Sequence, residues 1–188
     1  MSLMDDNYYK NKEINPAGPY DRMDTVLHRI AWAKENAQPN WVVLDLGCAD
    51  GYTLFSIEKD IPIGGIGVDL NEKLIEEARA RAKDTNLIFY QEPITKRWFE
   101  DVDMICMFEV IEHIKEPQLV WDYMKKYKGA QLFLTTPLKE GMYEESNPDP
   151  EHINIYSQKR LEAEIGSFAT IVDLHIQDDL LHIQAVIR

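Results

Sequence analysis

Two carboxylates flank a glycine-containing turn in the first third of the chain. Asp45 stands two residues before Gly47, Asp50 stands directly before Gly51, and the mostly apolar run 42–46 leads into the turn. A strand, a glycine-rich turn and a helix present a nucleotide-like ligand at the carboxyl ends of a parallel sheet. Two carboxylates would repel a diphosphate, so this turn suits a ligand with an ammonium or sulfonium group beside an adenosine.

The glycine spacing also separates this turn from the dinucleotide-binding fingerprint. A G-x-G-x-x-G pattern that starts at Gly47 needs glycine at position 49 and a small residue at position 52, where the chain has Ala49 and Tyr52. A dinucleotide-dependent oxidoreductase would share the sheet, but it is disfavoured by this spacing. The sequence instead reads D-x-G-x-x-x-G over 45–51.

A second acidic position follows the next predicted strand. The run 63–70 is apolar and glycine-rich until Asp69, which stands 18 residues after Gly51. In an open parallel sheet, an acidic residue about 20 residues after the glycine turn accepts hydrogen bonds from ribose hydroxyls. The competing interpretation is that Asp69 caps the next helix, and the glycine turn favours the ligand contact.

The stretch E-V-I-E-H-I over 109–114 carries the third group with chemical potential. It directly follows the run 103–108, which is apolar after Asp103. His113 has an unperturbed pKa near neutrality, which makes it the candidate general base if the acceptor is a hydroxyl or a protonated amine. The alternative is that His113 only packs or caps at a helix start.

These stretches together resemble one enzyme family. The D-x-G-x-x-x-G stretch resembles motif I of the class I (Rossmann-like) S-adenosylmethionine-dependent methyltransferases. E-V-I-E-H-I and the T-T-P at 135–137 resemble the branch that includes ubiquinone-type O-methyltransferases and many small-molecule enzymes. The resemblance covers about residues 24–188. It implies transfer of a methyl group from S-adenosyl-L-methionine to an O or N acceptor on a small molecule, with S-adenosyl-L-homocysteine as the product.

The resemblance also implies roles for individual residues. Leu70 would flank the adenine, Glu92 would lie by the adenine amino group, and Phe108 and Glu109 would lie beside the methyl-bearing sulfur. The catalytic candidates are His113 and Glu109. The residues that would contact the cofactor are Asp45, Gly47, Cys48, Ala49, Asp50, Gly51, Asp69, Leu70, Glu92 and Phe108.

Two alternatives share these residues. Glu109, Glu112 and His113, with the distant His152, resemble the metal set of the small-RNA 3′-end 2′-O-methyltransferases, and such ligands could hold a divalent cation. E-x-x-E-H also occurs in members of the class without a metal, and the chain has no basic RNA-binding stretch, so we expect no metal. A non-catalytic S-adenosylmethionine-binding module is the other alternative.

The periodicity of apolar residues predicts the elements that position these groups. Five strands alternate with helices, and a hairpin that turns at 178–179 ends the chain. This pattern predicts a doubly wound α/β fold with three layers, α/β/α. The family's seven-stranded, mostly parallel sheet has the order 3-2-1-4-5-7-6 with strand 7 antiparallel. The helices are expected over 24–37, 52–59, 71–83, 119–127 and 157–165, and the five strands over 42–46, 63–70, 87–90, 103–108 and 131–137.

The domain boundaries follow from the same pattern. Residues 1–23 are expected to form an N-terminal arm that could act as a lid, and residues 24–188 to form a single methyltransferase domain. The long irregular connection 138–157 is expected to be a substrate loop, since such connections in compact domains are usually functional.

Composition limits the partners. Among 188 residues, 33 are acidic and 20 are basic, which gives a net charge of −13 and makes nucleic acid an unlikely partner. No apolar stretch is long enough for a membrane span and no signal peptide is evident, so we expect a cytoplasmic protein, monomeric or homodimeric, that acts on a small molecule. Cys48 and Cys106 form no disulfide framework or zinc spacing.

Overall fold

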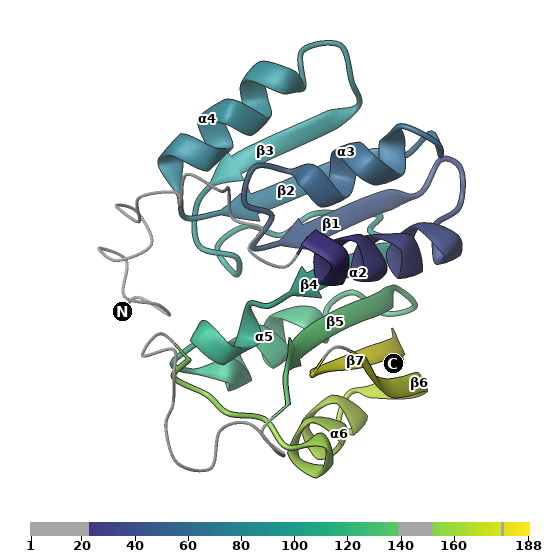
Figure 1. The fold of residues 1–188 in the computed structure, drawn as a ribbon, viewed down its shortest axis with the longest axis vertical. Helices are drawn as coiled ribbons and strands as arrows, with labels where there is room; N and C mark the ends of the chain where they lie inside the picture. Colours follow the sequence, from purple (N-terminus) through teal and green to yellow (C-terminus); the bar gives the residue numbers. More distant parts are fainter. Residues whose placement is uncertain (1–22, 139–151, 178) are drawn as a thin grey trace. The chain divides into compact units, whose positions relative to one another are not determined.

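The computed structural model of the chain describes residues 23–138, 152–177 and 179–188 (Figure 1). The expected N-terminal arm, 1–23, falls almost wholly outside these residues, and so does most of the expected substrate loop, 138–157. The described residues belong to two compact units, Met1–Met104 and Ile105–Arg188.

The strands form one seven-stranded sheet with the order β3-β2-β1-β4-β5-β7-β6, which confirms the predicted topology. Strands β1, β2 and β3 pair in parallel, whereas β7 is antiparallel to both β5 and β6. The strands are β1 (Val42–Leu46), β2 (Gly64–Asp69), β3 (Leu87–Gln91), β4 (Met104–Phe108), β5 (Gln131–Pro137), β6 (Ala169–Gln177) and β7 (Leu180–Ile187).

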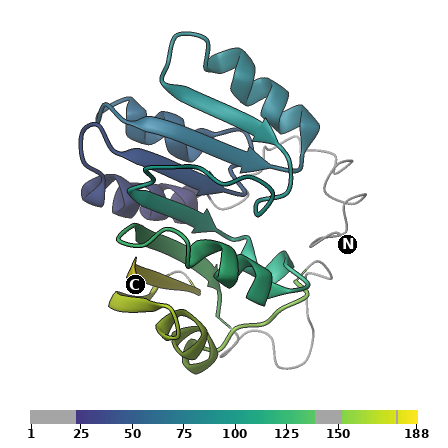
Figure 2. The same cartoon turned by 180° about the vertical axis from the view of Figure 1, so that it is seen from behind.

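In the first unit, helices α2 (Met23–Asn36), α3 (Tyr52–Glu58) and α4 (Glu72–Arg81) lie on one face of the parallel strands (Figures 1 and 2). Parallel strands need such crossover helices, because a short turn cannot return the chain to the starting edge. Helix α4 begins after Asn71, whose side chain accepts a hydrogen bond from the backbone N–H of Leu74. The three helices confirm the predicted ones to within a few residues.

Glycines in β2 allow large side chains to lie against this strand. A Cβ on Gly67 would lie 2.4 Å from the Phe89 ring and 2.8 Å from Cys48 Sγ, and a Cβ on Gly65 would lie 2.4 Å from Leu87. Side chains at these two positions would therefore displace the neighbours that cover the strand. The glycine-rich sequence of β2 thus serves packing next to the turn that follows β1.

In the second unit, helices α5 (Pro117–Met124) and α6 (Gln158–Gly166) are tied together by Trp121. Its indole stacks on Phe168 with ring centroids 5.7 Å apart, and its Nε1 donates a hydrogen bond to Glu164 at 2.9 Å. Helix α5 starts two residues earlier than expected, with Pro117 in its first turn, where proline is favoured. Ser157 caps α6 by accepting a hydrogen bond from the N–H of Arg160, as the sequence predicts.

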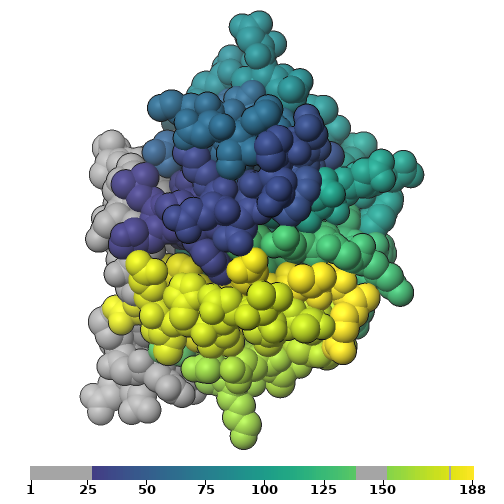
Figure 3. Space-filling model, turned by 90° about the vertical axis from the view of Figure 1, so that its right-hand side faces the viewer, coloured from purple at the N-terminus to yellow at the C-terminus, as the bar shows by residue number. Residues whose placement is uncertain are grey.

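The terminal hairpin pairs as predicted, but its two strands differ in burial. On β7, the alternating apolar residues 181–187 are buried. On β6, Val172 is 61% exposed and Ile176 is 50% exposed, because β6 is an edge strand with a register shift between Ile171 and Asp173. Residues of this C-terminal hairpin form the yellow surface in Figure 3.

Among the helices of the described ranges, none has the length and apolar character that a bilayer crossing requires.

Candidate functional site

The turn after β1 alternates residues of left-handed backbone conformation. Gly47 and Gly51 both have φ 79°, and Ala49 between them has φ 49°. A Cβ on Gly51 would lie 2.6 Å from the Phe89 ring, so both the backbone angle and the space require glycine there. The N–H of Gly47 donates to the carbonyl of Val68 at 2.8 Å, which ties the turn to the end of β2.

Asp69, at the end of β2, holds the turn from the neighbouring strand. Its Oδ2 accepts a hydrogen bond from the N–H of Ala49 at 2.9 Å, and its Oδ1 accepts one from the N–H of Asn71 at 2.8 Å. Burial raises the pKa of Asp69, and the backbone donors of Asn71, Ala49 and Leu70 oppose this rise. The carboxylate therefore joins the two strand ends, and its remaining lone pairs can accept further hydrogen bonds from a diol.

Asp45 is a buried carboxylate with one oxygen that the chain does not satisfy. It is 2% exposed, and its Oδ2 has no hydrogen-bond partner among the described residues. Burial raises the pKa of Asp45 to about 7, while the positive charge of Arg29 and a hydrogen bond with Thr53 oppose the rise. Such an oxygen is costly to bury unless a donor reaches it, so the observation fits a cationic group of a ligand.

Asp50 has a partner within the chain. Its Oδ2 forms an ion pair with Arg81 at 3.1 Å, and its Oδ1 accepts a hydrogen bond from the N–H of Tyr52 at 3.2 Å. The Arg81 guanidinium also lies over the Phe55 ring, 4.2 Å from its centroid. Because this carboxylate is engaged by Arg81 and by the start of α3, Asp45 is the better candidate for contact with a ligand ammonium.

The remaining cofactor candidates of the first unit are also buried. Cys48 is buried, and burial raises the pKa of its thiol. Leu70 is buried directly after β2. Glu92 follows β3 as expected, but its Oε1 forms an ion pair with Arg97 Nε at 2.7 Å, and Lys96 Nζ lies 3.8 Å from its Oε2. Its contact with an adenine amino group stays a prediction.

In the second unit, Phe108 and Glu109 stand at the end of β4. Phe108 is buried. Glu109 has φ 56°, a conformation that non-glycine residues rarely adopt, and its N–H donates to the carbonyl of Thr135 at 3.0 Å. Its Oε1 accepts a hydrogen bond from Thr135 Oγ1 at 2.8 Å. The positions of Phe108 and Glu109 beside a cofactor sulfur stay predictions.

Glu112, His113 and His152 form a cluster in the second unit. Their potential ligand atoms all lie within 4.8 Å of one another, and the two imidazole centroids are 5.0 Å apart. Glu112 is 1% exposed, and its Oε2 accepts a hydrogen bond from Thr136 Oγ1 at 3.0 Å. The structure thus brings together three of the four residues of the predicted metal alternative. Glu109 is not part of this cluster in the portion of the chain that is described.

Sequence reasoning did not find three contacts that support these groups. Arg29 in α2 acts on Asp45, Arg81 in α4 binds Asp50, and Asn154 donates its backbone N–H to the carbonyl of Glu112 at 2.8 Å. Each contact joins residues far apart in the sequence, so no local spacing could have indicated it.

Comparison with known proteins identifies the family. The family described as "Methyltransferase domain" matches residues 37–154. A relative, the mitochondrial ubiquinone biosynthesis O-methyltransferase of Candida albicans, is 28% identical over 103 residues, which are 50% of this chain and 32% of that protein. The match therefore spans about a third of the length of this curated relative.

Solved structures share the fold over nearly the whole chain. The structure titled "Complex between the Haloferax volcanii Trm112 methyltransferase activator and the putative methyltransferase" has a TM-score of 0.79 and 17% identity, and the match covers 100% of this chain and 99% of that one. The magnesium protoporphyrin IX methyltransferase of Synechocystis PCC 6803, solved with bound S-adenosylmethionine, has a TM-score of 0.74, 16% identity and full coverage of both chains. A methyltransferase from Aquifex aeolicus has a TM-score of 0.70 and 17% identity, over 94% of this chain and 100% of that one. From the family match over residues 37–154 and the strand order β3-β2-β1-β4-β5-β7-β6, this chain belongs to the methyltransferase-domain family and has the Rossmann-like fold of the class I S-adenosylmethionine-dependent methyltransferases.

Proposed function

We propose that the protein transfers a methyl group from S-adenosylmethionine to an oxygen or nitrogen atom of a small molecule. The observation that carries this proposal is the buried Asp45 Oδ2 beside the left-handed turn 47–51, with no hydrogen-bond partner among the residues that the structure describes. An oxygen of this kind suits an ammonium group, which S-adenosylmethionine carries in its methionine portion.

The residues of the first unit fit this cofactor. Asp45 binds the ammonium directly or through water, and the backbone of the turn 47–51 lies along the methionine portion. Asp69 accepts hydrogen bonds from the ribose hydroxyls with the lone pairs that Ala49 and Asn71 leave available. Leu70 flanks the adenine. When bound, the cofactor supplies an electrophilic methyl group on a sulfonium centre.

The residues of the second unit supply the group that activates the acceptor. His113 Nε2 lies 3.9 Å from Glu112 Oε1, too far for a hydrogen bond but close enough for the carboxylate to stabilise an imidazolium. The Thr136 hydroxyl holds the other oxygen of Glu112 and so fixes this side chain. His113 therefore accepts the proton of an acceptor hydroxyl as its oxygen bonds to the methyl group. If the acceptor is an ammonium, His113 removes a proton first, which frees the nitrogen lone pair for the attack.

The nature of the acceptor follows from charge and from the curated relative. A net charge of −13 opposes binding of a polyanion, which favours a neutral or cationic small molecule. The relative in Candida albicans is named as an O-methyltransferase of ubiquinone biosynthesis, which supports an oxygen acceptor here. An oxygen acceptor would also make use of a general base at neutral pH.

A second candidate is favoured by the cluster of Glu112, His113 and His152. Two imidazoles and a carboxylate whose ligand atoms lie within 4.8 Å of one another form a donor set that suits zinc and other divalent transition metals. A cation there would lower the pKa of an acceptor hydroxyl and would replace His113 as the activating group. The RNA 2′-hydroxyl that this ligand set suggests by resemblance is opposed by the net charge of the chain.

Binding and turnover test the two candidates together. S-adenosylhomocysteine at 100 times its dissociation constant should stabilise the fold by about 2.7 kcal/mol, which corresponds to a rise in Tm of roughly 5–11 °C. A screen of small phenols, carboxylates and amines with tritiated methyl donor should then find a labelled product. Activity that persists after treatment with a chelator favours His113 as the general base. Activity that the chelator abolishes and added metal restores favours a cation bound by Glu112, His113 and His152. Binding without any turnover would leave only a cofactor-binding module.

A further inference from the structure

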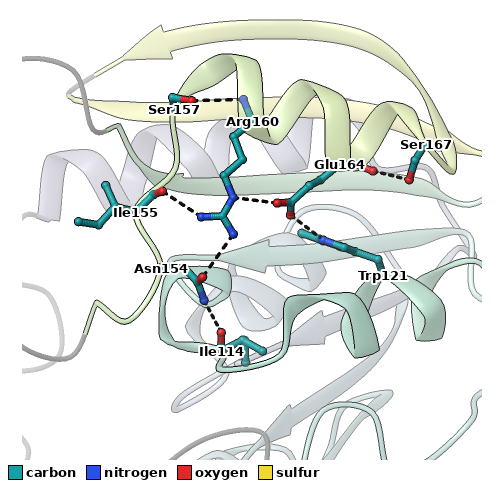
Figure 4. Close-up of polar contacts among 8 residues, drawn as sticks. All are labelled: Ile114, Trp121, Asn154, Ile155, Ser157, Arg160, Glu164 and Ser167. Atoms are coloured by element: carbon teal, nitrogen blue, oxygen red, sulfur yellow. Dashed lines mark hydrogen bonds and ion pairs between the residues drawn. The ribbon is translucent and has the colours of Figure 1, made fainter.

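Asn154 contacts the backbone on both sides of His113. Its N–H donates to the carbonyl of Glu112 at 2.8 Å, and its side-chain Nδ2 donates to the carbonyl of Ile114 (Figure 4). These two carbonyls belong to the residues directly before and after His113. The 3₁₀ turn Ile111–His113 is therefore held to the segment 152–156 at its last residues.

The third polar group of Asn154 is held by helix α6. Its Oδ1 accepts a hydrogen bond from Arg160 Nη2 at 3.3 Å, and Arg160 Nη1 donates to the carbonyl of Ile155 at 3.2 Å (Figure 4). The same guanidinium lies over the Tyr156 ring, 4.3 Å from its centroid. Arg160 thus contacts three consecutive residues of the segment. The planar guanidinium makes this possible, because its N–H donors point in several fixed directions.

Arg160 is in turn connected through Glu164 of its own helix to the buried Trp121 of α5. Its Nε donates to Glu164 Oε1 at 2.8 Å, and Glu164 Oε2 accepts a hydrogen bond from Trp121 Nε1 at 2.9 Å. Trp121 is 2% exposed. The series Trp121, Glu164, Arg160 and Asn154 therefore connects the core of the second unit to Ile114, as Figure 4 shows. Ile114 directly follows His113.

His152 stands two residues before Asn154, so its Cα lies within about 7 Å of the Cα of Asn154. The His152 and His113 rings meet edge to face, with centroids 5.0 Å apart and planes at 62°. The contacts of Asn154 fix the segment two residues away from His152 and on both sides of His113.

We propose that Asn154 is a positioning residue, which sets the His152 imidazole against His113 and Glu112 and is itself oriented by Arg160. The role rests on the proposed function, because it matters for catalysis only if His113 or the three-residue cluster acts in methyl transfer. The position requires an amide: Nδ2 must donate to the carbonyl of Ile114 while Oδ1 accepts from Arg160. A carboxylate at 154 would keep the contact to Arg160 and would repel the carbonyl of Ile114.

The geometric part of the proposal is tested on the full-length protein without any ligand. In protein labelled at its five histidines, nuclear Overhauser spectroscopy should give a cross-peak between the His113 and His152 rings. Asn154→Ala and Asn154→Asp should lose this cross-peak. Arg160→Lys, which keeps the charge near Glu164 but not the fork, should weaken it and provides a milder variant if the first two fold poorly. Lys159→Ala, an exposed cation on the same helix, is the matched control and should keep it.

The catalytic part is tested by separating kcat from KM once an acceptor is known. Displacement of a catalytic group by about 1 Å can reduce turnover about 100-fold. Asn154→Ala and Asn154→Asp should therefore lower kcat by up to that factor, while S-adenosylhomocysteine still binds. Lys159→Ala should keep the parent kcat. A cross-peak that survives in both Asn154 variants would overturn the proposal, and so would an unchanged kcat. If the parent protein methylates nothing, the proposed function fails, and the cross-peak still decides the geometry independently.

Discussion

Asp69 Oδ2 accepts the hydrogen bond of the Ala49 N–H at 2.9 Å, so the carboxylate that ends β2 shapes the turn that follows β1. The same carboxylate is the predicted partner of the cofactor ribose. Helix capping and ligand binding were competing interpretations in the sequence. The residue that caps α4 is Asn71, not Asp69, and the contact of Asp69 with a ligand stays a prediction. Oδ1 accepts from the N–H of Asn71 while other lone pairs of the carboxylate can accept from a diol.

Asp69→Ala should therefore weaken both the fold and the cofactor complex. Loss of a charged acceptor for two backbone N–H groups should cost about 1–3 kcal/mol of unfolding free energy, a fall in Tm of roughly 2–12 °C. Loss of the ribose contact should weaken S-adenosylhomocysteine binding by roughly 10–100-fold. Urea unfolding and isothermal titration calorimetry measure the two effects.

The exposed Asp84 provides a matched control for this substitution. Asp84→Ala removes the same charge without touching the turn, and it should leave both the Tm and the affinity unchanged. An Asp69→Ala variant that binds S-adenosylhomocysteine as tightly as the parent would show that the ribose does not contact this carboxylate.

Asp45 should give the stability of the cofactor-free protein an unusual pH dependence. Its pKa is about 7 in the folded chain and about 3.9 in an unfolded one, so the folded state holds an extra proton between these values. The stabilising contribution of Asp45 to the free energy of unfolding is therefore fully present below pH 4. It is lost as the pH rises toward 7, and the loss is about 4 kcal/mol at most. Asp45→Asn has no carboxyl group to titrate at this position, so its stability should not show this decrease. In urea unfolding, the stability of the variant relative to the parent should therefore increase from pH 5 to pH 7.5.

The same carboxylate should couple cofactor binding to proton release. An ammonium beside Asp45 favours its ionised form, so binding lowers the pKa and releases a proton near pH 6.5. The affinity for S-adenosylhomocysteine should rise between pH 5.5 and pH 7, by at most about 10-fold per pH unit. Calorimetry in buffers of different ionisation enthalpy counts the proton. Equal pH profiles for the parent and Asp45→Asn would contradict the ammonium contact.

Ala49 gives a prediction about the turn itself. Its φ of 49° is left-handed, a conformation that costs a residue with a Cβ roughly 1–2 kcal/mol. Ala49→Gly removes this strain but adds conformational entropy to the unfolded chain, at a cost of about 0.5–1 kcal/mol. The variant should be as stable as the parent or more stable, by up to about 1.5 kcal/mol in urea unfolding. A clear loss of stability would mean that the methyl group of Ala49 packs favourably.

The elements of the fold could be predicted because their signals are local. The apolar run 42–46, the helical spacing in 71–83 and the alternation in 181–187 each lie within one element, and the spacing of Asp69 from Gly51 follows from one strand, helix and strand.

The contacts that support the site could not be predicted from the sequence. The ion pair between Arg81 and Asp50 spans 31 residues. Residues this far apart in the sequence come into contact only when the helices pack against the strands.

The Asn154 contact to Ile114 spans 40 residues and shows the same limit in the second unit. The sequence grouped Glu109 with Glu112, His113 and His152 because E-x-x-E-H with a distant histidine resembles a known metal set. The chain instead places Glu109 at a left-handed position after β4, where its carboxylate contacts Thr135.

Tyr156 gives the last prediction, because its hydroxyl is buried without a clear benefit to the fold. The residue is 0% exposed, and within the ranges that the structure covers its hydroxyl oxygen has no hydrogen-bond partner. Burial, with Glu164 nearby, raises the pKa of Tyr156 above its ordinary value, so the hydroxyl stays protonated. Tyr156→Phe keeps the ring under Arg160 and removes the unsatisfied group, so it should raise the unfolding free energy by about 1 kcal/mol. Urea unfolding measures this change, and the cross-peak between His113 and His152 should persist in the variant. A loss of more than about 1 kcal/mol would instead show that the hydroxyl is satisfied in solution, by water or by residues outside the described ranges.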